Sequence, residues 1–241
     1  MALLNYISFT LFILFTSTSA QYQIVELSNA LDETNDTVDL SKNDLYLLND
    51  KYAYYQDDKV DVKLYYECLC PDCIQFDKNK FSPVVQNLSQ YLNIHLYPYG
   101  NAQTFGHNGR YDFKCQHGPA ECYGNKLHAC AIDYLQNITE AVEFNACMME
   151  YKSNDEAADR CANAMYLDSR PIKACAKGER GTQLLKYYGE ESKKANFSYV
   201  PYILINGKLN SGDNFMEDIC AEFAVAPPPC VELYNSSEYY H

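Results

Sequence analysis

Two cysteines separated by two residues, Cys70 and Cys73, are the clearest candidates for catalytic residues in the sequence. Residues 60–66 before them alternate apolar and polar side chains as a strand does, and residues 74–92 after them repeat apolar side chains at helical spacing. The pair is therefore expected at a helix N-terminus, where free N–H groups and the helix dipole favour a thiolate. This spacing predicts a redox pair in which Cys70 attacks a disulfide and Cys73 resolves the mixed disulfide.

Two other roles remain open for such a pair, namely half of a zinc site or a structural disulfide. Further side chains that could act as zinc ligands are Cys115, His117, Cys122, His128 and Cys130. The sequence has no second Cys-x-x-Cys pair, and an oxidising compartment favours disulfides. We therefore expect no metal at this pair.

The elements that must position the pair follow a simple order along the chain. A strand at 60–66, a helix at 74–92 that kinks or restarts at Pro83, and a strand at 92–99 are followed by short cysteine-linked helices over about 110–195. A strand over 199–208 then ends in the hairpin signal Asn206-Gly207, and residues 213–223 suggest a last amphipathic helix.

Val200 and Pro201 stand just before the last of these strands. In thioredoxin-like folds a cis-proline at this position lies against the Cys-x-x-Cys pair and leaves a backbone edge open to substrate. Strand, cysteine pair, helix, strand and Val-Pro occur here in the order of that fold. The predicted fold class is α/β, with a thioredoxin-like core and a disulfide-stapled helical insertion, and Val200 and Pro201 are expected to bind substrate.

Four segments divide the chain. Residues 1–20 are uncharged, with an apolar run too short for a bilayer and small residues before Gln21, which is typical of a secretory signal peptide. Residues 21–58 form an acidic extension or propeptide, 59–230 the main domain, and 231–241 a C-terminal tail. No later stretch could insert into a membrane. We expect a secreted, lysosomal or endosomal protein.

The mature chain is strongly acidic and offers several glycosylation sites. A net charge of −13 argues against nucleic acid or an anionic membrane as partner. Five sequons are available for glycosylation after entry into the secretory pathway, at Asn35, Asn87, Asn137, Asn196 and Asn235.

The cysteine count is odd, which requires at least one unpaired thiol among the eleven cysteines. Setting aside Cys70, Cys73 and the neighbouring Cys68 leaves eight that could form four disulfides: Cys115, Cys122, Cys130, Cys147, Cys161, Cys175, Cys220 and Cys230. Cys220–Cys230 is the favoured single pairing, and the others stay open. Strand alternation would turn Cys68 to the same side as Cys70. Cys68 is predicted to be the odd thiol, either buried and inert or able to intercept the mixed disulfide.

The run from Cys115 to Cys130 matches the pattern C-Q-H-G-x-x-E-C-x-x-N-x-x-x-x-C. In this run, and in Tyr65-Tyr66-Glu67 and Tyr99-Gly100-Asn101-Ala102, the chain resembles the gamma-interferon-inducible lysosomal thiol reductase family over residues 59–230. The resemblance implies a thioredoxin-like core, reduction of protein disulfides at acidic pH by Cys70 and Cys73, and no bound cofactor. Members of this family assist antigen processing in vertebrates, and in other animals they are described as immune or secreted factors.

Three residues of the signature, Gln116, His117 and Glu121, have two readings: turns and caps that hold the helices, which we favour, or a role at the active site. His117 could move a proton near pH 5–6, but nothing in the sequence puts it beside Cys70, so it stays outside the expected catalytic pair. Two functions compete with a reductase of disulfide-containing proteins. One is a disulfide oxidase or isomerase of the same fold, and the other is a secreted non-enzymatic binding protein.

Overall fold

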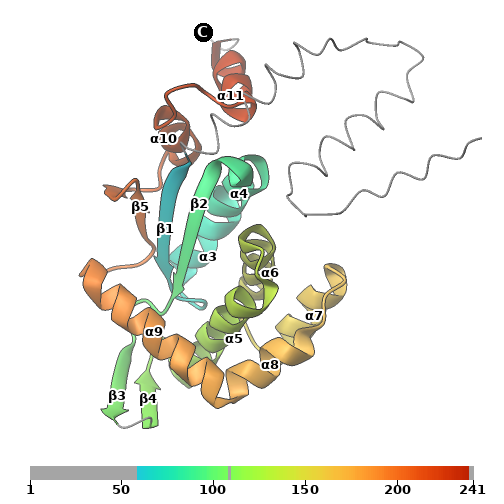
Figure 1. Cartoon of the computed structure of the whole chain (residues 1–241), viewed down its shortest axis with the longest axis vertical. Helices are drawn as coiled ribbons and strands as arrows, with labels where there is room; N and C mark the ends of the chain where they lie inside the picture. The colour runs from blue at the N-terminus through green and yellow to red at the C-terminus, as the bar shows by residue number, and fades with distance from the viewer. Residues whose placement is uncertain (1–58, 108–109, 239–241) are drawn as a thin grey trace, which may run out of the picture. The chain divides into compact units, whose positions relative to one another are not determined.

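A mixed four-stranded sheet forms the centre of the core domain (Figure 1). The computed structural model describes residues 59–107 and 110–238. The strands lie in the order β2 (Leu92–Pro98), β1 (Val60–Tyr66), β5 (Tyr202–Ile205) and β6 (Lys208–Asn210). Strand β1 runs parallel to β2 and antiparallel to β5. The signal peptide, the 21–58 extension and Asn35 lie outside the described residues.

Alternation along β1 decides which face of the sheet is buried in the main core. Val60, Val62 and Leu64 are at most 2% exposed and belong to one apolar cluster, while Asp61 and Lys63 point to the other face. In register, Val62 pairs with Ile94 of β2 and with Ile205 of β5. The apolar positions that predicted strands thus form one continuous layer.

The helical stretch after Cys70 is continuous but irregular. It consists of α3 (Pro71–Phe76), a π-helical turn η1 (Asp77–Phe81), α4 (Ser82–Leu88) and a short 3₁₀ turn η2 (Ser89–Tyr91). The N–H of Ser82 reaches back five residues to the carbonyl of Asp77. Pro83 has no N–H to donate and fits the first turn of a helix, so the hydrogen-bond pattern restarts here, with α4, without a break in the helical stretch. The predicted restart at Pro83 is present.

The helical insertion forms a second apolar cluster, which includes Leu127, Phe144 and Leu185 and is rich in alanine and cysteine. Its helices are α5 (Pro119–Leu135), α6 (Ile138–Glu150), α7 (Asp155–Ala164), α8 (Ser169–Lys177) and α9 (Glu179–Ala195). Helices α5 and α9 contact β2, so the insertion packs directly on the core (Figure 1). The predicted α/β core with a disulfide-stapled helical insertion is therefore present.

Four disulfides join the eight cysteines that remain after Cys68, Cys70 and Cys73 are set aside. The pairs are Cys115–Cys122, Cys130–Cys175, Cys147–Cys161 and Cys220–Cys230. The first three lie in the insertion. The last links α10 (Phe215–Ala221) to α11 (Pro228–Glu238) at the edge of the core.

Two expected boundaries are wrong. Residues at the start of the expected helical insertion, from about 110, instead form the strand β4 (Arg110–Lys114), which pairs with β3 (Gln103–His107) just before it, and the first helix begins at Pro119. The hairpin sequence alternates aromatic residues with polar ones and carries Asn-Gly at 108–109, a strong turn signal. Helix α11 also extends through most of the predicted tail, since Pro228 supplies a favourable first turn.

Two expectations concern the surface of the described part: that no segment spans a membrane, and that the sequons are accessible to glycosylation. No helix in residues 59–107 and 110–238 combines the length and apolarity needed to cross a membrane. The four sequon asparagines inside this part, Asn87, Asn137, Asn196 and Asn235, are all exposed. An oligosaccharide could therefore be attached at each of them.

Candidate active site

Cys70 occupies the N-cap position of α3, directly before Pro71. The residue is only 7% exposed. The hydrogen bond from the Cys73 thiol lowers the pKa of Cys70 to about 6; burial and the charge of Asp72 oppose this shift, and the N–H groups of Cys73 and Asp72 add to it. The helix N-terminus therefore stabilises a thiolate in the way that the spacing of the pair predicted.

Cys73 lies one turn deeper and is almost inaccessible, at 1% exposure. Burial, and its hydrogen bond to Cys70, raise the pKa of the Cys73 thiol far above its ordinary range. Both cysteines are unpaired in this structure. The Cys70 thiol thus loses its proton easily, whereas the neighbouring Cys73 thiol keeps its proton.

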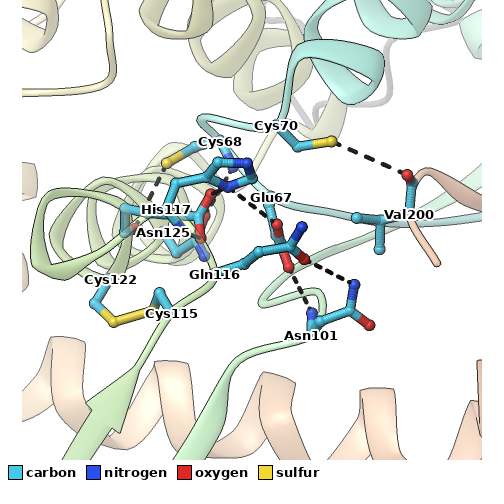
Figure 2. Close-up of polar contacts among 11 residues, drawn as sticks. Glu67, Cys68, Cys70, Asn101, Cys115, Gln116, His117, Cys122, Asn125 and Val200 are labelled. Carbon is cyan, nitrogen blue, oxygen red and sulfur yellow. Dashed lines mark hydrogen bonds and ion pairs between the residues drawn. A yellow bond between two sulfur atoms is a disulfide. The ribbon is translucent and has the colours of Figure 1, made fainter. Parts of the chain in front are cut away.

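Val200 and Pro201 lie next to the reactive sulfur, as their position in the sequence led us to expect. The Val200–Pro201 peptide bond is cis, and the Val200 carbonyl oxygen lies 4.0 Å from Cys70 Sγ (Figure 2). Their expected role in binding substrate is taken up below.

Cys68 is also unpaired, but it points away from the redox pair. Its thiol donates to the carbonyl of Glu121 at 3.6 Å, on the side of α5, whereas the sulfur of Cys70 faces Val200 (Figure 2). The expectation that both sulfurs share one side is wrong, because β1 ends at Tyr66 and a turn replaces strand alternation before Cys70. Cys68 is fully buried, and burial raises its pKa well above the ordinary value.

Glu67 lies between β1 and the cysteine pair, with a fully buried side chain. Its Oε1 accepts a hydrogen bond from the N–H of Asn101 at 2.6 Å, and its backbone carbonyl accepts one from the N–H of Cys70. The side chain amide of Asn101 in turn donates to Gln116 (Figure 2). A Cβ at Gly100 would sit 2.2 Å from the Glu67 side chain, so glycine is required there. The turn after β2 is thus shaped around this carboxyl group.

His117 and Glu121 complete the same cluster from the insertion. Glu121 is fully buried and accepts two hydrogen bonds from His117, one from the backbone N–H and one from Nδ1. His117 Nδ1 also lies 3.4 Å from Glu67 Oε2. Burial disfavours the imidazolium, but the hydrogen bond to Glu121 and the charges of Glu121 and Glu67 outweigh it and raise the pKa of His117.

The cluster of Glu67, His117 and Glu121 has the compactness of a metal site, with one ligand atom from each within 4.8 Å of the others. However, both oxygens of Glu121 and Oε1 of Glu67 already accept hydrogen bonds from N–H donors. We therefore interpret the three residues as a proton-bearing network.

The zinc ligands considered from the sequence do not form a site. Cys115, Cys122 and Cys130 are held in disulfides and have no thiolate to offer. His128 is buried between the hydroxyls of Tyr66 and Ser153, each 2.9 Å from a ring nitrogen. Burial lowers the pKa of His128 to about 3, so it is a neutral core residue.

Sequence reasoning placed Cys70 and Cys73 at a helix N-terminus but missed Glu67 and Asn101 as their neighbours, and it kept His117 outside the site. The available signal was a single carboxyl group in an otherwise apolar run leading into the cysteine pair. The Cys115–Cys122 bridge encloses both His117 and Glu121 and holds their loop against that carboxyl. The signature residues therefore do more than cap helices, since they reach the surroundings of Cys70.

Comparisons with known proteins agree on family and fold. The family model described as "Gamma interferon inducible lysosomal thiol reductase (GILT)" matches residues 61–165. A "Gamma-interferon-inducible lysosomal thiol reductase-like protein" of Anopheles gambiae is 32% identical over 200 residues, covering 74% of this chain and 83% of the relative. The mouse "Gamma-interferon-inducible lysosomal thiol reductase" is 32% identical over 184 residues, covering 73% and 74%.

Two solved structures resemble the fold at low sequence identity. DsbA from Mycobacterium tuberculosis in its reduced form has a TM-score of 0.53 at 15% identity, covering 73% of this chain and 88% of that protein. Oxidised BdbD from Bacillus subtilis has a TM-score of 0.51 at 15% identity, covering 69% and 88%. At this identity the likeness concerns the fold alone.

Proposed function

This chain belongs to the gamma-interferon-inducible lysosomal thiol reductase family, and on that premise we propose that it reduces disulfide bonds in protein substrates at acidic pH. In this proposal Cys70 is the attacking thiolate and Cys73 the resolving thiol. The observation that carries it is the position of Cys70 at the N-cap of α3 beside the buried Cys73, where the Cys73 thiol and two N–H groups lower the pKa of Cys70 while burial raises that of Cys73.

The lowered pKa supports activity in an acidic compartment. With a pKa of about 6, Cys70 is roughly one tenth thiolate at pH 5, whereas an ordinary cysteine is about 0.03% thiolate there. The gain in reactive species is therefore on the order of several hundredfold. Such a gain answers the objection that acid shuts down thiol chemistry.

The reaction proceeds in two exchanges. The Cys70 thiolate attacks one substrate sulfur, a bond forms between them, the substrate disulfide breaks, and its other sulfur leaves as a thiolate that takes up a proton. Cys73 then loses its proton and attacks Cys70 Sγ, which releases the second substrate thiol and leaves a Cys70–Cys73 disulfide. The enzyme is oxidised by two electrons and the substrate is reduced by two.

The remaining residues take supporting roles in this proposal. The Val200 carbonyl and Pro201 form the backbone edge on which the substrate segment lies. Cys68, buried and turned toward α5, stays inert during turnover. A secreted or lysosomal destination and glycosylation at the exposed sequons complete the proposal.

A reductase assay near pH 5 tests the proposal directly. The substrate is a denatured disulfide-bonded protein, a small thiol regenerates the enzyme, and wild type is compared with Cys70→Ser, Cys73→Ser and Cys68→Ser. We expect Cys70→Ser to be inactive, Cys73→Ser to accumulate a mixed disulfide, and Cys68→Ser to match wild type. Equal activity in wild type and Cys70→Ser would reject the proposal, and a measured reduction potential tests the reducing direction.

A further inference from the structure

Glu67 is the point where three segments distant in the sequence meet next to Cys70. It follows β1, its Oε1 is bound by Asn101 from the turn after β2, and its Oε2 faces His117 from the start of the insertion (Figure 2). Oε2 is buried and accepts no hydrogen bond, with His117 Nδ1 3.4 Å away. The carboxyl group is thus rigidly held but incompletely solvated, which disfavours its negative charge.

The charges around Glu67 do not balance when every group is ionised. Two buried carboxylates, Glu67 and Glu121, face a single imidazolium from His117. A Cys70 thiolate adds another negative charge, and its electrostatic interaction reaches both Glu67 and His117. Like charges in a buried site exclude each other, so one of the groups must keep a proton.

We propose that Glu67 is a positioning residue whose proton is coupled to the charge on Cys70. While Cys70 is a thiolate, Glu67 stays protonated and adds no opposing charge. Once Cys70 is bonded to a substrate sulfur, its charge has left with the departing substrate thiolate. Where the pH lies near the Glu67 midpoint, between about 6 and 7, Glu67 then releases its proton, which balances the proton taken up by that thiolate; at pH 5 it keeps its proton in both states. The inference rests on the proposed role of Cys70 as nucleophile.

The titration behaviour of the neighbours supports this coupling. Burial raises the pKa of Glu67 to about 7; the Asn101 N–H opposes the rise, the charges of Glu121 and Cys70 add to it, and His117 opposes it. The thiols of Cys68 and Cys73 are the other titratable groups that interact with Glu67, and both keep their protons in this range. Glu67 therefore changes charge across the pH interval between an acidic compartment and neutral surroundings.

The first test follows alkylation of Cys70 by iodoacetamide from pH 4 to 9, without any disulfide substrate. We expect two inflections in wild type, one near pH 6 for Cys70 and a second between about 6 and 8 as Glu67 ionises beside the thiolate. Glu67→Gln, which keeps the acceptor for Asn101, should show one inflection. Identical profiles in the two proteins would overturn the inference.

Asp77→Asn is the matched control. Asp77 is another buried carboxyl group and lies in the helical stretch that follows Cys70. Burial raises its pKa to about 7, as for Glu67, but its charge acts on Tyr66 rather than on Cys70. We expect this variant to keep the two-step profile of wild type. Loss of the second step here would assign it to Asp77 and overturn the role of Glu67.

A second measurement is independent of how well Glu67→Gln folds. Carbon-13 NMR of the glutamate carboxyl carbons follows Glu67 in wild type and in Cys70→Ser. We expect its midpoint to fall by about one pH unit, a tenfold change in proton affinity, once the thiolate is absent. An unchanged midpoint overturns the coupling. Neither titration requires turnover, so a coupled Cys70 that fails to reduce protein substrates would defeat the proposed function and leave this inference standing.

Discussion

The core and the insertion hold together in different ways. The core rests on a sheet whose alternating valine, leucine and isoleucine side chains pack against large aromatics such as Phe81 and Phe215, and its one disulfide is buried in the same apolar cluster. The insertion packs many alanines between its helices and contains three disulfides. Small side chains bury little apolar area, so covalent links supply the stability that the insertion lacks. The three free thiols belong to the region that can do without such links.

The largest effect is expected from the longest disulfide loop. Cys130→Ala with Cys175→Ala opens a bridge that spans 45 residues, and we expect a loss of about 4 kcal/mol of unfolding free energy. Urea denaturation measures it. The matched control is Cys220→Ala with Cys230→Ala in the core, which spans 10 residues and should cost about 3 kcal/mol. A larger loss for the core bridge would contradict the comparison.

A buried acid of the core gives the next largest effect. Burial raises the pKa of Asp77 to about 7. The unfolded chain therefore releases this proton near pH 4, whereas the folded chain keeps it up to about pH 7. Stability from this group is therefore present in acid and lost as pH rises. Asp77→Asn should gain on the order of 3 kcal/mol relative to wild type between pH 4 and 7. Parallel stability curves for the two proteins would show that Asp77 ionises normally.

The smallest of the expected effects on stability comes from a helix cap in the insertion. Asn137 caps α6 by accepting hydrogen bonds from the N–H groups of Thr139 and Glu140, and it is also a sequon asparagine. In unglycosylated protein, Asn137→Ala should lose about 1 kcal/mol on thermal or urea unfolding. Asn137→Asp removes the sequon but keeps the cap, so its stability should match wild type. Equal losses in both variants would mean that the cap contributes nothing.

Much of the core could be read from the sequence because its signals are local. Alternation predicted β1, Asn206-Gly207 predicted the β5–β6 turn, and Pro83 predicted the restart of the helix. The position of Cys70 at a helix N-terminus followed from a strand, a cysteine pair and a helix in direct succession. Each inference needed only residues within one turn or one strand of one another.

The surroundings of the cysteine pair depend on tertiary contacts, which the spacing of residues along a single sequence does not reveal. Glu67, Asn101 and His117 are far apart in the chain and meet only when β1, the turn after β2 and the insertion are packed together. Disulfide pairing was open for the same reason. The direction of Cys68 was misjudged because the turn after Tyr66 breaks the strand period two residues before the active site.

Burial of the structural disulfides has a further consequence if Cys70 is the nucleophile that we propose. Thiol–disulfide exchange requires the attacking sulfur to approach its target, and both sulfurs of Cys220–Cys230, like Cys130 and Cys161 in the insertion, lie in residues at most 2% exposed. The Cys220–Cys230 bridge is therefore closed to a thiolate of a second copy, whereas Cys147 and Cys175, the partners of Cys161 and Cys130, are only partly buried. Close packing makes the core bridge a poor target for thiol–disulfide exchange and leaves two bridges of the insertion more open to it.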